Sequence, residues 1–485
     1  MEILSAADEE LKDAIDDENR TLQKKIKNGL IRPEYISTAY IEENWGDGEP
    51  VKRPVVDLVQ QGGGMYGIAL LGYTYIMEKI GIRFYSHGGT SAGAINASFL
   101  AAINSDVYEQ KSPFDNSRFA TKSEVLTHII ANTDFSKFMG KTGIIGRLQR
   151  MLFKNFKSLA LKLIVFGFIL GFLVIIYSAF GFLYKISHGL SGFELRYFDF
   201  IIGTINVIAL VIILYILFVK VLGVRFGINS GNEFYEWVDN LLALMHIHTT
   251  DDLYERMSES EIEPHREGDK PRLVLISSNL THNRIAKFPE RAGDYWEDFG
   301  NIKPAAYLRA TMSLPFIFKT FIPSVAHYKV PHPADSVKLK ARFVDGGMLS
   351  NFPIREFHTS NPKPRFPTFG VLLSDIGLNR DEEYEPEADG LPEITLMEYV
   401  SSFFKTFRNF YDYEFIFNSK EIRDRVVTVN TKNFNWLDFW MDEPTQKKLF
   451  LVGVRAAIRQ IDKFNWSAYE TVREQMVYQH KYMKK

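Results

Sequence analysis

A serine framed by glycines constrains the fold of this chain more than any other feature. Residues 89–93 read Gly-Thr-Ser-Ala-Gly and stand between a strand-like apolar run and an alanine-rich, helix-like stretch. G-x-S-x-G in a strand–turn–helix context is typical of a nucleophile elbow, a tight turn that requires small residues such as Gly89 and Gly93. Ser91 would then begin the helix, where free N–H groups favour developing negative charge. A chance glycine–serine turn is the alternative explanation.

Strand-like and helix-like segments alternate along the rest of the chain. Apolar residues recur at helical spacing over residues 449–464. Predicted strands cover residues 55–59, 82–86, 273–277, 343–344, 370–373 and 426–429. This alternation favours an α/β layer fold with a mainly parallel sheet.

Two apolar blocks interrupt the alternating pattern. Residues 163–184 and 200–219 contain no charged residue, and at about 1.5 Å per residue each can cross a hydrocarbon core of roughly 30 Å. We therefore predict a transmembrane hairpin inserted between two soluble parts; a pair of buried helices in a large soluble core is the alternative. Basic residues gather outside the two blocks rather than between them, so the positive-inside rule predicts that both soluble parts are cytoplasmic.

A second glycine cluster follows the predicted strand 55–59. Residues 62–67 read Gly-Gly-Gly-Met-Tyr-Gly and match the G-x-G-x-x-G dinucleotide pattern. Dinucleotide binding also requires an acidic residue at the end of the next strand, and residues 80–85 contain none. The cluster is better explained as an oxyanion hole, in which backbone N–H groups bind a carbonyl oxygen. Its predicted residues are Gly62, Gly63, Gly64, Met65 and Gly67.

A serine nucleophile also needs a base to accept its proton. Asp345, Gly346 and Gly347 follow the predicted strand 343–344. An aspartate can act as this base if its surroundings raise its pKa and it hydrogen-bonds the hydroxyl. A type I′ turn is the alternative explanation for the tripeptide.

Histidine is the more usual base, and the chain contains 11 histidines. His87 lies close to Ser91 in sequence, but it belongs to the strand that leads into the elbow, where a packed or surface histidine is the simpler interpretation. His358 follows the Asp-Gly-Gly segment and is the best candidate for a triad if the base is not Asp345.

The composition excludes several kinds of site. The chain has no cysteine, so disulfides, thiolate metal sites and a cysteine nucleophile are excluded. The formal net charge of −2 gives no electrostatic argument for nucleic acid as a partner.

The acidic run 381–389 lacks the ligand spacing of an EF-hand calcium loop. The acid-rich residues 1–20 are predicted to form a solvated helix or a frayed tail.

The glycine-rich loop, the G-x-S-x-G turn and the Asp-Gly-Gly segment, in this order, resemble the patatin-like phospholipase family. Residues 277–281, Ser-Ser-Asn-Leu-Thr, and residues 309–315, Arg-Ala-Thr-Met-Ser-Leu-Pro, add to the likeness. The resemblance covers roughly residues 55–103 and 273–373. Each motif alone is common, whereas the ordered set is specific.

The resemblance implies a three-layer α/β/α sandwich and a Ser91–Asp345 dyad that works without histidine. Ser91 would attack the ester carbonyl, and Asp345 would accept its proton and later activate water. The amides of Gly63, Gly64 and Met65 would bind the oxyanion, and neither cofactor nor metal is expected. Family members often carry Arg or Lys where this chain has Tyr66, so either weaker support for the anion or a different substrate preference is expected here, although the backbone donors remain.

We accordingly predict an integral membrane enzyme with two spans and a cytoplasmic catalytic domain. It would cleave acyl esters of phospholipids or lysophospholipids, and the hairpin allows self-association; nucleic acid is not an expected partner. The alternatives are a neutral-lipid or small-ester esterase and a catalytically silent scaffold of the same fold. The predicted division is an N-terminal helical extension (1–54), a first catalytic part (55–140), the hairpin insertion (141–228) and a second catalytic part with C-terminal helices (229–485).

Overall fold

The computed structural model divides the chain into two compact units. The first unit comprises Met1–Phe138, Gly231–Leu314 and Thr320–Lys485, and the second Met139–Ser230 and Pro315–Lys319. The structure describes residues 2–43, 50–104, 119–139, 203, 226–323, 341–359, 361, 363–374 and 396–483. All residues that the sequence marks as catalytic lie in the described part of the first unit.

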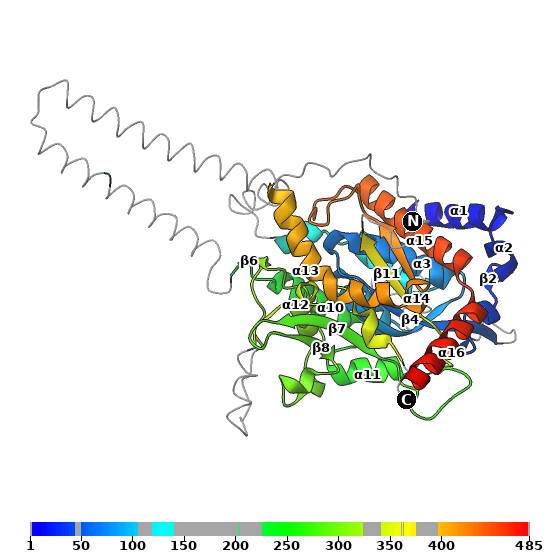
Figure 1. Ribbon diagram of the computed structural model, residues 1–485. Coiled ribbons are helices and arrows are strands. Elements are labelled where there is room, and N and C mark those ends of the chain that lie inside the picture. The colour runs from blue at the N-terminus through cyan, green and yellow to red at the C-terminus, as the bar shows by residue number, and fades with distance from the viewer. Residues whose placement is uncertain are drawn as a thin grey trace, which may run out of the picture. The chain divides into compact units, whose positions relative to one another are not determined.

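An eight-stranded sheet forms the centre of the first unit (Figure 1). Five strands run parallel to one another in the order β7 (Leu273–Asn279), β5 (Arg83–Thr90), β4 (Val51–Gln60), β11 (Thr368–Ser374) and β12 (Val426–Asn430). Three antiparallel strands complete it: β3 (Tyr40–Glu43) beside β4, and β8 (Arg284–Pro289) and β10 (Phe343–Asp345) beside β7. The prediction of a mainly parallel sheet is confirmed, whereas β3 and β8 were not predicted.

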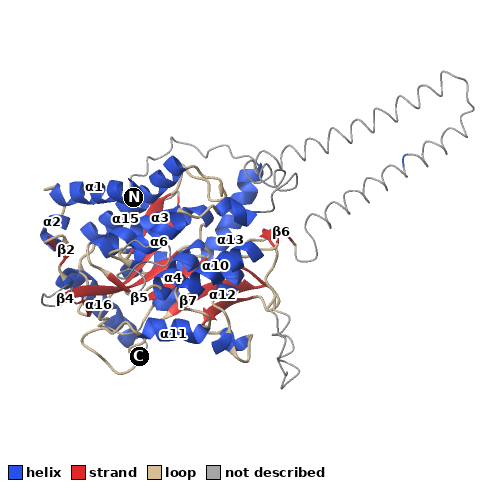
Figure 2. Cartoon of the chain, turned by 180° about the vertical axis from the view of Figure 1, so that it is seen from behind, coloured by secondary structure: helices blue, strands red, loops and turns tan. Residues whose placement is uncertain are grey.

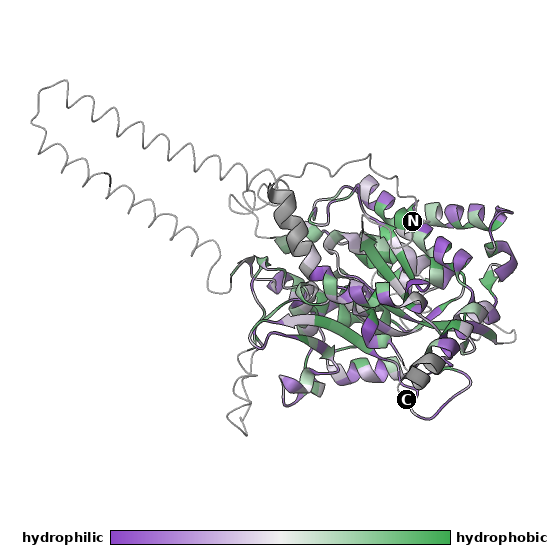
Figure 3. Ribbon diagram, in the orientation of Figure 1, coloured by the Kyte–Doolittle hydropathy of each residue, from purple (hydrophilic) through white to green (hydrophobic). Residues whose placement is uncertain are grey.

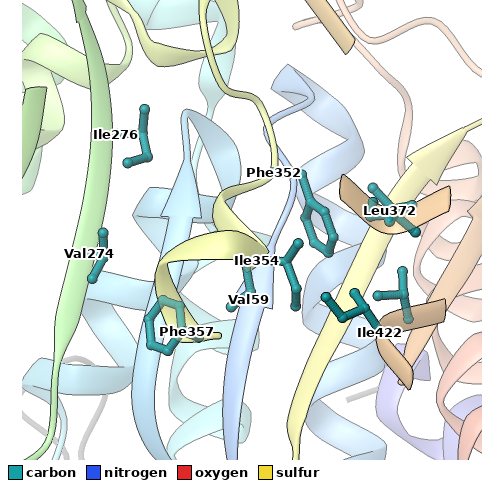
Figure 4. Packing of buried hydrophobic residues seen from close by; sticks show 10 residues of the cluster. Val59, Val274, Ile276, Phe352, Ile354, Phe357, Leu372 and Ile422 are labelled. Carbon is teal, nitrogen blue, oxygen red and sulfur yellow. The ribbon is translucent and has the colours of Figure 1, made fainter. Parts of the chain in front are cut away.

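Helices cover both faces of this sheet, as expected for parallel strands that are apolar on both sides (Figure 3). On one face lie α3 (Gly67–Lys79), α4 (Ala92–Ala102) and α15 (Glu443–Lys463), which Figure 2 shows from behind. On the other face, η8 (Pro353–Phe357), α13 (Leu396–Asn418) and α14 (Lys420–Arg423) contribute to a buried cluster (Figure 4). The architecture is therefore a three-layer α/β/α sandwich.

Consecutive residues of β4 show how the two faces are separated. Val59 points into the cluster formed with Phe352 and Ile354. Gln60, the next residue, meets the other layer, where its Oε1 accepts a hydrogen bond of 2.8 Å from Asn96 Nδ2 of α4. This alternation is the period of two that any strand imposes on its side chains.

The remaining described elements surround this sandwich or belong to the second unit. In the second unit, β6 (Gly227–Asn229) pairs in parallel with β9 (Phe316–Phe318). Elsewhere the helices and strands are α1 (Glu2–Asp16), α2 (Leu22–Lys25), β1 (Ile26–Lys27), β2 (Leu30–Ile31), α6 (Lys122–Ala131), α10 (Asn232–Leu244), α11 (Thr250–Ser258), α12 (Ala305–Thr311) and α16 (Trp466–Met483).

The acid-rich N-terminus is not the solvated helix or frayed tail that the sequence suggested. Helix α1 buries Ala7, Leu11 and Ala14 and contacts α15. Its acidic residues find partners on neighbouring helices: the Glu10 carboxylate lies 3.0 Å from Arg455 Nε of α15. Contacts with neighbouring helices thus hold α1 against the rest of the unit, although its many acidic residues alone favour exposure to solvent.

No helix within the described ranges is both long and apolar enough to cross a membrane. The two predicted spans, residues 163–184 and 200–219, fall outside these ranges except for Gly203. The acidic run 381–389, considered above for calcium, also lies outside the described residues. The hairpin and the proposed division of the chain therefore stay predictions.

Close packing of α3 against α15 gives a test of the sandwich. A Cβ atom placed on Gly453 of α15 would lie 1.8 Å from the Ala69 carbonyl oxygen of α3. We expect Gly453→Ala to force the helices apart and to lower the free energy of unfolding by about 1–3 kcal/mol, the usual cost of overpacking. Urea denaturation measures this, with Gly293→Ala as the control because its nearest neighbour would be 3.4 Å away. Equal stability of the two variants would contradict this packing.

Candidate active site

Ser91 occupies a strained turn between β5 and α4. Its φ of 53° and ψ of −120° lie on the side of backbone space that only glycine enters freely. Its neighbours must be small: a Cβ on Gly89 would lie 2.4 Å from the Gly93 carbonyl oxygen, and one on Gly93 2.3 Å from that of Gln60. The residue is buried and directly precedes the first turn of α4. This is the geometry of a nucleophile elbow.

The register of the sheet brings Asp345 to this turn. Strand β5 pairs with β7 up to Thr90, which faces Ile276. Strand β10 pairs with the same edge of β7 from the opposite direction, and its last residue, Asp345, faces Ser277. Because Ile276 and Ser277 are consecutive, the ends of β5 and β10 meet on one edge of β7. Ser91 and Asp345 are therefore adjacent, although they are far apart in the chain.

The Ser91 hydroxyl and the Asp345 carboxylate have different contacts in the structure. In the structure, Ser91 Oγ lies 3.1 Å from Met312 Sδ. Asp345 Oδ1 accepts a hydrogen bond of 2.7 Å from the Gly347 amide, whereas Oδ2 is buried and accepts none from the described residues. The sulfur is a weak hydrogen-bond acceptor, and the Ser91 hydroxyl is near enough to Asp345 to affect the pKa of its carboxyl.

Burial raises the pKa of Asp345 above its ordinary value. The positive charge of Arg408, the hydrogen bond from the Gly347 amide and the nearby Ser91 hydroxyl each oppose that shift. A carboxylate with a raised pKa binds a proton more readily than an exposed one, which is what a general base at neutral pH requires.

The tripeptide 345–347 does not form the type I′ turn considered above. Gly346 and Gly347 begin a short 3₁₀ helix, η7 (Gly346–Met348), for which Asp345 is the N-cap. Neither glycine has a positive φ, whereas a type I′ turn needs positive φ at both central residues. A Cβ on Gly346 would lie 2.1 Å from the Ile276 carbonyl oxygen, so the motif needs glycine for close approach to β7.

Three of the five predicted oxyanion amides already donate hydrogen bonds inside the protein. The Gly62 amide bonds the Asn351 carbonyl at 3.0 Å, and the Met65 amide bonds the Trp436 carbonyl at 2.9 Å. The Gly67 amide caps the preceding 3₁₀ turn. These three residues therefore shape the loop rather than present donors to a ligand.

The amides of Gly63 and Gly64 find no acceptor among the described residues. Gly64 has a φ of +53°, and a Cβ there would lie 2.5 Å from the Trp436 carbonyl oxygen, so no other residue fits without movement. Tyr66, which stands where the family often has a cation, donates its hydroxyl to the Phe434 carbonyl at 2.7 Å. Tyr66 thus fastens the loop to the segment before α15.

An apolar cavity of about 50 Å³ lies beside the glycine loop and the start of α4. Its walls come from the loop, α3, α4, α6 and the turn after α6, and they are almost entirely hydrocarbon. The lining residues are Gly64, Met65, Gly67, Ile68, Leu71, Ala92, Ile95, Asn96, Leu126, Ile130 and Phe135. Ala92, which follows Ser91 in the chain, is among these residues, so the cavity lies next to the elbow.

Neither histidine candidate is hydrogen-bonded to Ser91. Burial and the charge of Lys122 lower the pKa of His87 to about 3, so this histidine is neutral, and its ring packs edge-on near Phe84. His358 Nδ1 lies 3.5 Å from the Glu421 carboxylate. The His358 side chain lines a separate, more polar cavity of about 310 Å³. The described residues also contain no cluster of carboxylates and histidines that could hold a metal ion.

Several residues around the site were missed from the sequence. Thr311 Oγ1 accepts the Ser91 amide at 2.9 Å, and Met312 contacts the hydroxyl. Both lie in the segment 309–315 that was noted only as a family likeness. Asn351, Arg408 and Asp412 carried no sequence signal, because their contacts join segments that are distant in the chain.

A mainly parallel sheet that carries a strained serine at the end of a strand is an arrangement found in α/β serine hydrolases. The model of the patatin-like phospholipase family matches residues 58–358, and the chain belongs to this family. The chain is also 23% identical over 402 residues to YqhO, an uncharacterized protein of Bacillus subtilis (strain 168), covering 82% of this chain and 94% of that protein. The crystal structure of VipD from Legionella pneumophila is similar over 92% of this chain and 73% of that one, with 14% identity and a TM-score of 0.38.

The environment of Asp345 predicts how ester hydrolysis depends on pH. A base acts only when ionised, and a raised pKa means that ionisation is lost earlier as the pH falls. We therefore expect kcat/KM for a soluble ester to decline on acidification above the ordinary aspartate pKa of about 3.9. The same profile is expected for His87→Ala and His358→Ala. An acid limb that disappears in either histidine variant would show that a histidine is the base.

Proposed function

We propose that this protein is a lipid acyl hydrolase in which Ser91 and Asp345 form a catalytic dyad. The observation that carries the proposal is the meeting of a strained, buried serine with a buried carboxylate whose Oδ2 is open. The family to which the chain belongs supports a hydrolase. The apolar cavity beside the serine supports a substrate whose acyl part is a hydrocarbon chain.

In the first half of the reaction, Ser91 Oγ attacks the ester carbonyl while its proton passes to Asp345. Negative charge develops on the carbonyl oxygen, and the amides of Gly63 and Gly64 are the donors available to stabilise it. When the intermediate collapses, the bond to the leaving alcohol breaks and that alcohol takes the proton from Asp345. The acyl group is then esterified to Ser91.

In the second half, water attacks the acyl-enzyme and gives up a proton to Asp345, which is again ionised. The new tetrahedral intermediate breaks its bond to Ser91 Oγ, and the serine recovers the proton from the aspartic acid. The free fatty acid is released. No redox change and no cofactor is needed, because one water supplies both the hydroxyl and the proton that the two products gain.

The substrate class that we propose is a phospholipid or lysophospholipid of the membrane to which the enzyme is anchored. The two apolar blocks support this anchoring, because each is long enough to span a bilayer. The basic residues outside them support a cytoplasmic catalytic domain. The second candidate is hydrolysis of neutral lipids or small esters, and the modest size of the cavity, about 50 Å³, favours small esters.

Removal of either dyad residue tests the chemistry. We expect Ser91→Ala to abolish both ester hydrolysis and labelling by a fluorophosphonate probe, because the nucleophile is lost. Asp345→Asn should lower the rate by about 10²–10⁴-fold, the usual contribution of general-base catalysis.

Matched controls come from α4 and β4, the elements that flank the site. Ser98 is a buried serine of α4 whose hydroxyl has no partner among the described residues, and Asp57 is a carboxyl of β4 whose pKa burial raises to about 7. Ser98→Ala and Asp57→Asn should retain labelling and hydrolysis. A Ser91→Ala variant with normal hydrolysis would refute the proposal.

The proposed anchor predicts both extraction behaviour and labelling. The full chain should stay with membranes through high-salt and carbonate washes. Insertion of apolar spans of 20 residues or more binds a protein to the bilayer far more strongly than electrostatic attraction does. Since the chain has no cysteine, single cysteines report sidedness. Ser191→Cys should react with an impermeant maleimide in intact cells, and Asp381→Cys only after lysis. The reverse pattern would place the dyad outside the cell.

A further inference from the structure

Asn351 joins the two loops that carry the proposed dyad chemistry. Its main-chain carbonyl accepts the Gly62 amide at 3.0 Å, and its side-chain Nδ2 donates to the Gly62 carbonyl at 2.9 Å. Two hydrogen bonds therefore fix the glycine loop to the segment that follows Asp345. The fit is close, because a Cβ on either Gly62 or Gly347 would lie 2.6 Å from Asn351 Oδ1.

Helix α13 holds Asn351 in this position. Arg408 Nη2 donates to Asn351 Oδ1 at 2.8 Å. The Asp412 carboxylate accepts three hydrogen bonds: from the Asn351 amide at 2.6 Å, the Phe352 amide at 2.8 Å and the Ser350 hydroxyl at 2.8 Å. Asn351 and Asp412 are both buried, so water does not compete for these bonds.

We propose that Asn351, held by Asp412 and Arg408, is a positioning residue that sets the glycine loop at the distance from Ser91 and Asp345 that the reaction needs. Asn351 is not catalytic itself, because it contacts the two loops and not the reacting atoms. The inference rests on the proposed function and deepens it. A displacement of about 1 Å between oxyanion donors and nucleophile can cost on the order of 100-fold in rate.

The energetics of Asp412 support a functional role. Burial raises the pKa of Asp412 to about 6, although its three hydrogen bonds and the charge of Arg408 oppose the shift. Because this folded-state pKa exceeds the unfolded value, the group makes the fold less stable as the pH rises from about 4 to about 6. An ionised Asp412 at neutral pH is thus a stability cost, of the kind that proteins retain where a site requires it.

The test compares Asn351→Ala, Asn351→Asp and Asp412→Asn with wild type in the full chain, and uses Asn418→Ala of α13 as the control. Asn418 is exposed and bonds only Glu414 among the described residues. The readouts are kcat and KM for a soluble short-chain ester, the number of active sites titrated by a fluorophosphonate at completion, and the thermal midpoint at pH 7.5.

We expect kcat per titrated site to fall roughly 10- to 100-fold in the three variants, with much smaller changes in KM. Asn418→Ala should behave as wild type, and Asp412→Asn should not lower the thermal midpoint. Variants that lose stability or titratable sites but keep wild-type kcat per site would show a merely structural role and overturn the inference. If Asn351→Ala does not fold, Asn351→Asp, which keeps the size of the side chain, decides the outcome.

These outcomes separate the inference from the proposed function. A wild-type protein that neither hydrolyses esters nor reacts with the probe would refute the hydrolase itself. An active wild type with equally active Asn351 and Asp412 variants would refute only the positioning role. A change confined to KM would also refute it, because it would place Asn351 in substrate binding.

Discussion

The edge of β7 that β5 and β10 share is the constraint on which the rest of this structure depends. Strand β5 runs parallel to β7 and strand β10 runs antiparallel to it. Their C-terminal ends meet opposite the consecutive β7 residues Ile276 and Ser277. The nucleophile and its proposed base are thereby placed by backbone hydrogen bonds, which leave little freedom. A one-residue shift of either strand would turn the side chains at its end to the other face.

Glycine residues make this close meeting of β5, β10 and β7 sterically feasible. The elbow, the loop before α3 and the Asp-Gly-Gly segment all bring backbone within contact of backbone, as in the 2.1 Å that would separate a Gly346 Cβ from the Ile276 carbonyl oxygen. Three amides of the loop donate hydrogen bonds within the protein and so fix the conformation of the loop. The amides of Gly63 and Gly64 have no acceptor among the described residues. Structural and reactive roles are thus divided between neighbouring residues of one loop.

Helix α13 connects this centre to the outer layer of the sandwich. Its inward residues Arg408 and Asp412 bond the segment after Asp345, while Ile416 enters the apolar cluster on the same face of the sheet. The hydrogen bonds of Asp412 are buried and directional, so they define one arrangement of the loops, whereas apolar contacts alone would tolerate several. The buried carboxylate of Asp412 therefore makes the arrangement of the loops specific, although its charge lowers the stability of the fold.

The sequence by itself determined the features that are local. Apolar runs predicted the parallel strands, and glycine spacing predicted the elbow, because both follow from the conformations that neighbouring residues can adopt. The order of three motifs was enough to indicate the family. Only the tertiary structure decided which amides of the glycine loop lack an acceptor among the described residues, that His358 lies beside Glu421 rather than the serine, and that Asn351 is held by a helix some 60 residues further along the chain. These depend on strand register and on contacts between distant segments, for which no short stretch of sequence carries a signal.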